Sequence, residues 1–300
     1  MNKHHVLKFQ LSGGLGNQLF QYAAGQFISS IGNHSVKYEI ARQGKFHWGS
    51  EITSILNFSQ CEINSESKPN TPILLLRFHK LFATKFKIYR KLSEQLSLGY
   101  FSPVLGFDPG LERIKRGNRI YGYFQSRIYA EAGRESIRSE IFRNAKTREM
   151  IELIEESKLS NPVMVHIRRG DYLSHRETIG LLSYKYFESA IKKASEGDTS
   201  RPIWVFTDNK EQALKLISEG GIKVNRIFGE ADGLGAIQTL EILATGMSIV
   251  ISNSTFSWWA AFLNSSDATI VHPSEWYRDL EVPGMLIPSH WYPVNSYWEN

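Results

Sequence analysis

Residues 6–40, VLKFQLSGGLGNQLFQYAAGQFISSIGNHSVKYEI, decide the fold class. Residues 6–11 alternate between apolar and polar side chains, as in a strand, and residues 18–31 place apolar side chains at a helical period. The glycine-rich turn at 12–17, Ser-Gly-Gly-Leu-Gly-Asn, joins them, and residues 35–40 predict a second strand. The order strand, turn, helix, strand predicts a β–α–β unit and therefore a parallel sheet.

A second α/β pattern begins after Asn161-Pro162. It predicts strands at 163–167, 202–206, 226–228, 248–252 and 268–272, and helices at 183–196, 210–218, 234–245 and 255–263. Before it, residues 119–125 predict a strand and residues 128–158 a helix interrupted near Asn144. Residues 41–118 give no clear pattern.

The predicted architecture is α/β, with two doubly wound Rossmann-type halves facing each other across a cleft. We place the boundary at Asn161-Pro162, which gives an N-terminal domain over 1–160 and a C-terminal domain over 161–300 whose tail can pack back on the first. Ligands of such sheets bind outside the carboxyl ends of the strands. Polar clusters follow predicted strands at 12–18, 166–172, 207–209 and 252–257, so we expect the binding site there.

The composition is that of an ordinary globular chain, with 300 residues of which 42% are hydrophobic and 22% charged. Its single cysteine, Cys61, allows neither an intrachain disulfide nor a cysteine-rich zinc site. The N-terminus lacks the apolar core of a signal peptide and no apolar run is long enough to cross a membrane, so we expect a cytoplasmic protein. Residues 77–92 carry six Lys and Arg and no acid, which leaves the rest of the chain close to neutral despite the net charge of +5. This distribution argues against a nucleic-acid binder.

The glycine-rich turn is the first candidate for binding a ligand. Its glycines would let a phosphate approach the backbone and the free N–H groups of the next helix, which makes Gly14, Gly16, Asn17 and Gln18 candidate contacts. The other interpretation is a plain strand-to-helix turn in which Asn17 caps the helix. The third glycine of a dinucleotide fingerprint is missing, but Glu39 lies where a ribose-binding acid would be, so a nucleotide-dependent oxidoreductase stays an alternative.

The second candidate is the stretch HIRRGDY, which follows a predicted buried strand. The guanidinium groups of Arg168 and Arg169 match phosphate oxygens in a bidentate fork and stay charged. His166 lies beside them, and Gly170 would let the chain turn so that Asp171 returns toward the arginines. The other interpretation is a surface turn with an Arg–Asp ion pair. We favour an anion site because of its place at the end of a strand.

Two further clusters lie at predicted strand ends. Asp208 and Asn209 could accept hydrogen bonds from a guanine edge or simply cap the next helix. Asn253, Ser254 and Thr255 begin a helix whose free N–H groups suit a phosphate, and the two tryptophans after them are expected in the core. The chain has neither a D-x-D pair after a strand nor an H-E-x-x-H motif, so we expect no metal and a diphosphate neutralised by arginines and helix ends.

Four stretches together resemble the α1,2-fucosyltransferases of glycosyltransferase family eleven. In the family's order, they are GGLGNQLFQY at 13–22, GYFQS at 122–126, HIRRGDY at 166–172 and SNSTFSWW at 252–259. The resemblance implies a GT-B-like fold with GDP-L-fucose as the donor. It further implies inverting, metal-independent transfer of fucose to the 2-hydroxyl of a galactoside.

The resemblance also implies roles for single residues. Arg168 would hold the donor diphosphate, with a contact that strengthens in the transition state as GDP leaves. The remaining expected donor contacts are His166 and Arg169 around the nucleotide, Asp208 and Asn209 at guanine, Asn253, Ser254 and Thr255 at the helix start, and Gly14, Gly16, Asn17 and Gln18 from the other domain.

The general base is the least defined part of the predicted site. Inversion requires a carboxylate or imidazole near the acceptor hydroxyl, and Asp171 and Glu177 are the candidates. Asp171 could equally orient an arginine, and Glu177 could be a solvated loop residue.

Residues 77–92 place aromatic and leucine side chains at a helical period with Lys and Arg between them. Because the resemblance is to bacterial members that decorate surface polysaccharides, this segment could dock on the inner membrane face or meet a lipid-linked acceptor. It could also be an amphipathic helix packed on its own domain. A protein that binds a GDP-sugar without catalysis is a further functional alternative.

Overall fold

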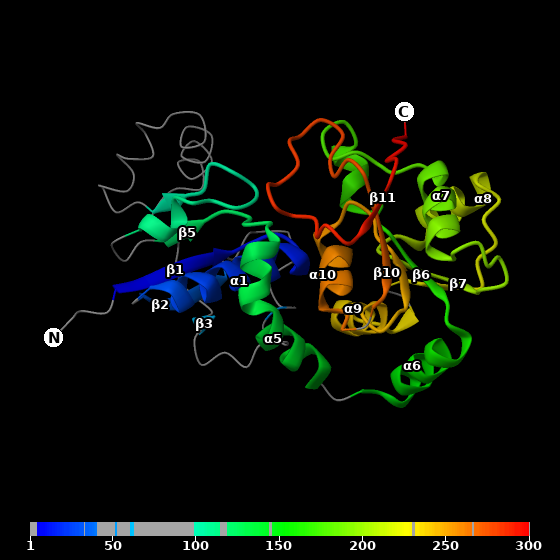
Figure 1. The fold of residues 1–300 in the computed structure, drawn as a ribbon, viewed down its shortest axis with the longest axis horizontal. Coiled ribbons are helices and arrows are strands. Elements are labelled where there is room, and N and C mark those ends of the chain that lie inside the picture. Colours follow the sequence, from blue (N-terminus) through cyan, green and yellow to red (C-terminus); the bar gives the residue numbers. More distant parts are fainter. Residues whose placement is uncertain are drawn as a thin grey trace. The chain divides into compact units, whose positions relative to one another are not determined.

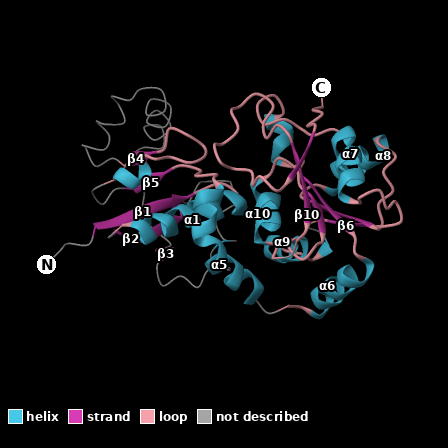
Figure 2. Ribbon diagram, in the orientation of Figure 1, coloured by secondary structure: helices cyan, strands magenta, loops and turns pink. Residues whose placement is uncertain are grey.

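The computed structural model describes residues 5–32, 34–40, 52, 61–62, 99–114, 119–143, 146–229, 232–265 and 267–299. The chain forms two compact units (Figure 1). The first is Met1–Glu140 with Pro283–Ile287, and the second is Ile141–Val282 with Pro288–Asn300. Each unit contains one parallel sheet with helices, as the sequence predicts (Figure 2).

The first unit is built on a parallel sheet with the strand order β3-β2-β1-β5-β4. Its strands are β1 (His5–Leu11), β2 (His34–Ile40), β3 (Cys61–Glu62), β4 (Tyr100–Phe101) and β5 (Arg119–Tyr121). Its helices are α1 (Leu15–Ile31), the 3-10 turn η1 (Leu111–Arg113) and most of α5 (Arg127–Arg143). The pairing of β1 with β2 runs in register from His5 and His34 to Leu11 and Ile40, which confirms the predicted β–α–β unit.

The turn between β1 and α1 is tighter than the sequence predicts. Gly13 has φ +78°, a conformation that favours glycine, and α1 already begins at Leu15 with Gly14 as its N-cap. The interpretation of Asn17 as the helix cap is therefore wrong. Asn17 lies within the first turn of the helix, where its side-chain oxygen accepts a hydrogen bond from Gln125 at 3.0 Å.

The second unit is built on a parallel sheet with the order β11-β10-β9-β6-β7-β8. Its strands are β6 (Val163–Ile167), β7 (Ile203–Thr207), β8 (Arg226–Phe228), β9 (Ser248–Val250), β10 (Thr269–Pro273) and β11 (Tyr292–Val294). Its helices are α6 (Arg148–Ser160), η2 (Asp171–His175), α7 (Tyr184–Ala194), α8 (Lys210–Glu219), α9 (Ala236–Leu243) and α10 (Thr255–Leu263). The predicted strands and helices after residue 161 are confirmed, whereas η2 and β11 were not predicted.

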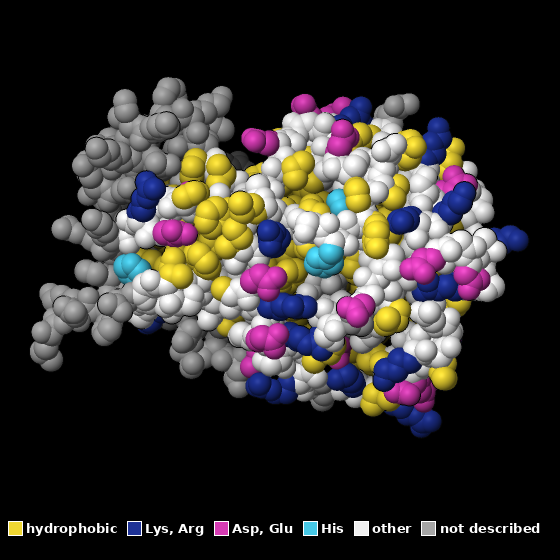
Figure 3. Space-filling model, in the orientation of Figure 1, with side chains coloured by type: hydrophobic (Ala, Val, Ile, Leu, Met, Phe, Trp, Pro, Cys, Tyr) yellow, Lys and Arg dark blue, Asp and Glu magenta, His cyan; other side chains and the backbone are white. Residues whose placement is uncertain are grey.

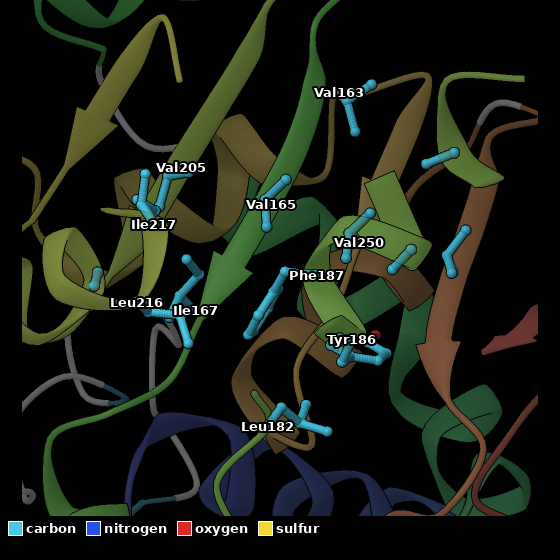
Figure 4. Packing of buried hydrophobic residues seen from close by; sticks show 14 residues of the cluster. Val163, Val165, Ile167, Leu182, Tyr186, Phe187, Val205, Leu216, Ile217 and Val250 are labelled. Carbon is cyan, nitrogen blue, oxygen red and sulfur yellow. The ribbon is translucent and has the colours of Figure 1, made fainter. Parts of the chain in front are cut away.

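Helices cover both faces of this second sheet, so its central strand β6 is buried along its whole length (Figure 1). Four of the five residues of β6 are apolar, as expected of a strand that is buried on both faces of a parallel sheet. Figure 4 shows one of the two packed layers, in which Val165 and Ile167 of β6 meet Phe187 of α7 and Leu216 of α8. The tryptophan pair of α10 is fully buried as predicted.

The division between the units differs from the predicted boundary at Asn161-Pro162. It falls at Glu140 and Ile141, so that α6 belongs to the second unit rather than the first. An ion pair of 2.8 Å between Glu156 of α6 and Arg226 of β8 contributes to this placement. Local sequence patterns could not show this, because the partner of α6 lies far along the chain. Of the C-terminal region, Pro283–Ile287 packs with the first unit and the residues after it with the second.

One prediction concerns residues outside the described part of the chain. The basic segment 77–92 lies there, so its proposed membrane contact stays a prediction. Among the described residues no helix is both long and apolar enough to cross a membrane. On the face drawn in Figure 3, acidic and basic side chains of the described residues lie interspersed rather than in one basic surface.

Glu39 of β2 is a buried carboxylate in the first sheet. Its Oε1 lies 2.8 Å from Nζ of Lys8 and its Oε2 lies 3.2 Å from Nε of Arg119, and Gln10 also donates to it. Burial raises the pKa of Glu39, but the hydrogen bonds from Lys8 and Gln10 and the charges of Arg119 and Lys8 outweigh it, so the pKa is lowered. Glu39 is thus used within the sheet, which weakens the case for it as the ribose-binding acid of an oxidoreductase.

We predict that Glu39→Gln destabilises the protein at pH 7 by about 1.5–3 kcal/mol, the range for hydrogen bonds to a charged group. The pKa of Glu39 is lower in the folded state than its ordinary value of 4.5. The carboxylate therefore stabilises the protein at any pH above 4.5, and this stabilisation is lost as the pH falls through the pKa of the folded state. Urea unfolding at pH 7 and at successively lower pH should show the difference between wild type and variant shrink. A difference that stays constant with pH would contradict the assignment.

Candidate functional site

Three of the four predicted polar clusters meet at one edge of the second sheet. Strands β9, β6 and β7 are neighbours and parallel, so their carboxyl ends lie side by side. The segments that follow them are 166–172, 207–209 and 252–257. The fourth cluster, at 12–18, belongs to the first unit.

Arg168 is held at this edge by two carboxylates. Its Nε and Nη2 donate to Oδ1 of Asp171 at 3.1 and 2.7 Å, and its Nε lies 3.1 Å from Oδ2 of Asp208. Its guanidinium also lies over the ring of Tyr172, 5.6 Å from the ring centroid. Burial lowers the pKa of Arg168, but the charges of Asp208 and Asp171 outweigh that effect and raise it, so the side chain is a fixed cation.

The two carboxylates beside Arg168 differ in their surroundings. The side chain of Asp208 is 15% exposed, and its Oδ1 accepts a hydrogen bond from the backbone N–H of Arg169 at 2.8 Å. The side chain of Asp171 is 46% exposed. Asp208 therefore holds the loop that follows β6, whereas Asp171 is accessible to solvent or to a ligand. This arrangement matches the predicted orienting role of Asp171.

Gly170 has to be glycine for the Asp208 contact to form. A Cβ at this position would lie 2.4 Å from Oδ2 of Asp208, well inside van der Waals contact. The predicted return of Asp171 toward the arginines takes place through η2, which begins directly after Gly170.

Arg169 points away from Arg168 into the protein. It is 3% exposed, its Nη2 donates to the carbonyl oxygen of Leu182 at 2.8 Å, and its Nη1 lies 2.8 Å from Oε1 of Glu299. The expected pocket-shaping role of Arg169 can therefore be only indirect. The sequence shows the two arginines as a pair, but the structure gives them different surroundings.

His166 and Ser252 connect the ends of β6 and β9. Nδ1 of His166 lies 2.9 Å from the Ser252 hydroxyl, and its ring lies near that of Phe256. Burial, and after it the charge of Arg168, lowers the pKa of His166 to about 3. The imidazole is therefore neutral at physiological pH and shapes the site without adding charge.

Tyr172 makes a second connection across the same edge. Its hydroxyl donates to the carbonyl oxygen of Asn253 at 2.9 Å, directly before Ser254, the N-cap of α10. The side-chain amide of Asn253 donates to the carbonyl oxygens of Ile179 and Gly180 at 3.1 and 3.3 Å. The amide of Asn253 thus holds the backbone around the site.

The start of α10 is the remaining anion-binding element at this edge. Ser254 makes no side-chain capping bond, and Thr255 is the first helical residue. The first N–H groups of a helix have no partner within the helix, and together with the helix dipole they favour an anion. Arg168 and this helix start stand at the ends of neighbouring strands, as predicted.

The other predicted site residues have simpler surroundings. Asn209 caps α8, since its Oδ1 accepts a hydrogen bond from the N–H of Gln212 at 3.0 Å. Glu177 is 77% exposed and lies 3.7 Å from Arg176, which fits the solvated loop residue weighed against a catalytic base. In the first unit, Gln18 donates to the carbonyl oxygen of Gly13 at 2.8 Å within the glycine-rich turn. Among the described residues no three His, Cys, Asp or Glu form a group that could hold a metal.

Comparison with known proteins identifies the family. Residues 114–282 match the sequence model of Glycosyl transferase family 11. The chain belongs to this family. It is therefore a glycosyltransferase, and the predicted pair of Rossmann-type α/β halves is confirmed, while their arrangement about a cleft stays a prediction.

The chain is similar to two curated relatives and to one solved structure. The chain is 28% identical over 293 residues to an alpha-1,2-colitosyltransferase of Escherichia coli, with 92% of this chain and 94% of the relative covered. It is 24% identical over 292 residues to the O-antigen biosynthesis glycosyltransferase WbnK of Escherichia coli, with 89% and 93% covered. NodZ alpha-1,6-fucosyltransferase, in a crystal soaked with GDP-fucose, superposes with a TM-score of 0.48 at 16% identity over 91% of this chain and 96% of that one.

We predict that Gly170→Ala destabilises the second unit by about 1–3 kcal/mol, because the added methyl displaces Asp208 from its charged hydrogen bonds. Thermal unfolding measures the loss. Gly229→Ala is the matched control, since a Cβ there would meet its nearest atom at an ordinary 3.5 Å. An equal effect of the two substitutions would contradict the tight contact between Gly170 and Asp208.

Proposed function

We propose that the protein transfers L-fucose from GDP-β-L-fucose to the 2-hydroxyl of a galactoside with inversion at the fucose anomeric carbon. The observation that carries the proposal is the fixed cation Arg168, which follows β6, while α10 begins after the neighbouring strand β9 at the same carboxyl edge of the second sheet. Such an edge is where a doubly wound sheet binds a nucleotide. The similarity to an alpha-1,2-colitosyltransferase supports the linkage. The choice of fucose rests on the resemblance of the four motifs to the α1,2-fucosyltransferases of the family.

Arg168 would act on the leaving diphosphate. Negative charge builds up on GDP as the glycosidic bond to fucose breaks, so a preorganised cation stabilises the transition state more than the bound donor. Asp208 and Asp171 fix the guanidinium before the donor arrives, which avoids reorganisation during the reaction. Ser254 and Thr255 would add backbone and hydroxyl contacts at the phosphates.

We assign Asp171 the orienting role, because its Oδ1 accepts hydrogen bonds from both Nε and Nη2 of Arg168, at 3.1 and 2.7 Å. The alternative is that Asp171 is the general base. A loss of turnover at unchanged GDP affinity in Asp171→Asn would favour the base, and a loss of GDP affinity would favour the orienting role.

Gly14, Gly16, Asn17 and Gln18 of the first unit are proposed to contact the fucose and diphosphate. Gly14 and Gly16 have no side chain, and Gly14 opens α1, so a ligand could approach backbone N–H groups there. We further propose that the reaction needs no metal, since a cation and a helix start can neutralise a diphosphate. The acceptor would belong to surface-polysaccharide synthesis, in line with the relative named for O-antigen biosynthesis.

The direct test is incubation with GDP-fucose and a panel of β-galactosides in excess EDTA. We expect GDP release and a new α1,2-linked fucoside, identified by linkage analysis. A colitosyl donor should be run in parallel, because one relative is named as a colitosyltransferase. Transfer from the colitosyl donor but not from GDP-fucose would support the proposed site and show that the transferred sugar is colitose rather than fucose. GDP binding without any product would favour the non-catalytic alternative, and binding of nicotinamide cofactor would revive the oxidoreductase.

We predict that Arg168→Ala lowers the turnover number by about 100- to 1,000-fold or more, as for the loss of one preorganised charge-stabilising donor. Steady-state kinetics at saturating donor measures it. Arg148→Ala is the matched control in the same unit, because Arg148 forms an exposed ion pair with Glu152 on α6. Near-normal turnover in Arg168→Ala would overturn the assignment of the diphosphate contact.

A further inference from the structure

The partners of Arg169 connect the candidate site to the C-terminal segment. The guanidinium of Arg169 is almost fully buried, and its neighbours are the carbonyl oxygen of Leu182 and the carboxylate of Glu299, both at 2.8 Å. Among the described residues Nε of Arg169 has no hydrogen-bond partner. Glu299 therefore supplies the negative charge that accompanies a buried cation.

Glu299 is itself fixed by the backbone around it. Its N–H donates to the carbonyl oxygen of Leu181 at 2.8 Å, and its own carbonyl oxygen accepts from Nη1 of Arg278 at 2.9 Å. The N–H of Ser183 donates to the carbonyl oxygen of Tyr297 at 2.8 Å, so the C-terminal segment 297–299 runs along the segment 180–183. The carboxylate of Glu299 is thus presented to Arg169 by a fixed backbone.

Trp298, next to Glu299, packs against the same segment 180–183. Its ring covers Gly180, where a Cβ would lie 2.6 Å from a ring carbon, and Gly180 has φ +87°. Its indole N–H donates to Oε2 of Glu275 at 3.1 Å. The segment that Trp298 covers also accepts the side-chain amide of Asn253, which lies just before α10. The C-terminal segment therefore contacts Arg169 directly and Asn253 only through Gly180.

A relay of contacts leads from Glu299 to Arg168. Glu299 holds the guanidinium of Arg169, and the backbone N–H of Arg169 donates to Oδ1 of Asp208 at 2.8 Å. The other oxygen of Asp208 lies 3.1 Å from Nε of Arg168. A shift of the Arg169 backbone would move Asp208 and with it the cation that faces the ligand.

We propose that Glu299 is a positioning residue for sugar transfer, acting on Arg168 through Arg169 and Asp208. The proposal rests on the function proposed above and adds a residue outside the motifs that identify the family. Glu299 lies more than a hundred positions along the chain from Arg169, so no local motif could show it.

The test begins with Glu299→Gln, which keeps the size of the side chain and removes its charge. We expect the turnover number at saturating donor to fall by about 10- to 100-fold, the effect of displacing a reacting group by about 1 Å. GDP affinity, measured by calorimetry, should weaken as well. The KM for the acceptor should stay unchanged. Glu299→Asp keeps the charge and should recover part of the turnover.

The matched control is Glu156→Gln, which removes the charge from a 2.8 Å ion pair with Arg226 elsewhere in the second unit. It should leave turnover and GDP affinity unchanged. Wild-type turnover and GDP affinity in Glu299→Gln would overturn the proposal.

A double variant keeps the proposal testable if Glu299→Gln folds poorly. Arg169→Met with Glu299→Met removes the buried cation and its partly exposed partner together, and replacing such an ion pair by apolar side chains is often neutral for stability. We expect a folded protein with turnover still reduced. A folded double variant with full turnover would show that the pair only balances charge, and would overturn the proposal.

Hydrogen exchange separates this proposal from the proposed function. In Glu299→Gln, peptides covering 166–173 should exchange faster than in wild type, since the Arg169 N–H bond to Asp208 is loosened. If the wild-type protein transfers no sugar, the proposed function fails. Faster exchange in Glu299→Gln would then show that Glu299 supports the fold of this loop without a role in transfer. Unchanged exchange would reject the relay itself.

Discussion

The candidate site depends on one carboxylate, that of Asp208. It follows β7 and reaches across to the loop after β6, where one oxygen accepts the N–H of Arg169 and the other faces Nε of Arg168. This contact is possible because β6 and β7 are parallel neighbours whose ends coincide in register at Ile167 and Thr207. Gly170 leaves the space for it. Asp208 therefore fixes both the direction of the Arg168 guanidinium and the backbone of the loop that carries it.

Each arginine of the motif has its own carboxylate partners, two for Arg168 and one for Arg169. Arg168 has Asp208 and Asp171, Arg169 has Glu299, and His166 is neutral because burial lowers its pKa to about 3. Buried charges are costly unless they are paired and hydrogen-bonded, so such a site can be dry and rigid only with these partners in place. The cost of the arrangement is that several partners come from distant parts of the chain.

The shared edge also explains why the start of α10 belongs to the same site. Ser252 bonds His166, and the carbonyl oxygen of Asn253 accepts the hydroxyl of Tyr172. These two contacts tie the loop after β6 to the loop after β9, on the opposite side of β6 from β7. An anion bound there would meet a guanidinium and a helix start held in one frame, which is the physical basis of the proposed diphosphate contact.

The sequence by itself determined the strands and helices of the second unit except η2 and β11, the β–α–β unit of the first, the parallel sheets, the burial of the tryptophan pair and the family. These features depend on periodicity within about ten residues or on short motifs, which are visible along the chain. It missed β11, which is only three residues long, lies at a sheet edge and contains Pro293, a residue confined to such edges. Only the tertiary structure decided where the units divide. It also decided that Arg168 and Arg169 have different partners, and that Glu299 pairs with Arg169. Successive side chains of an extended segment point to opposite sides, and their partners are chosen by packing between residues far apart in the sequence.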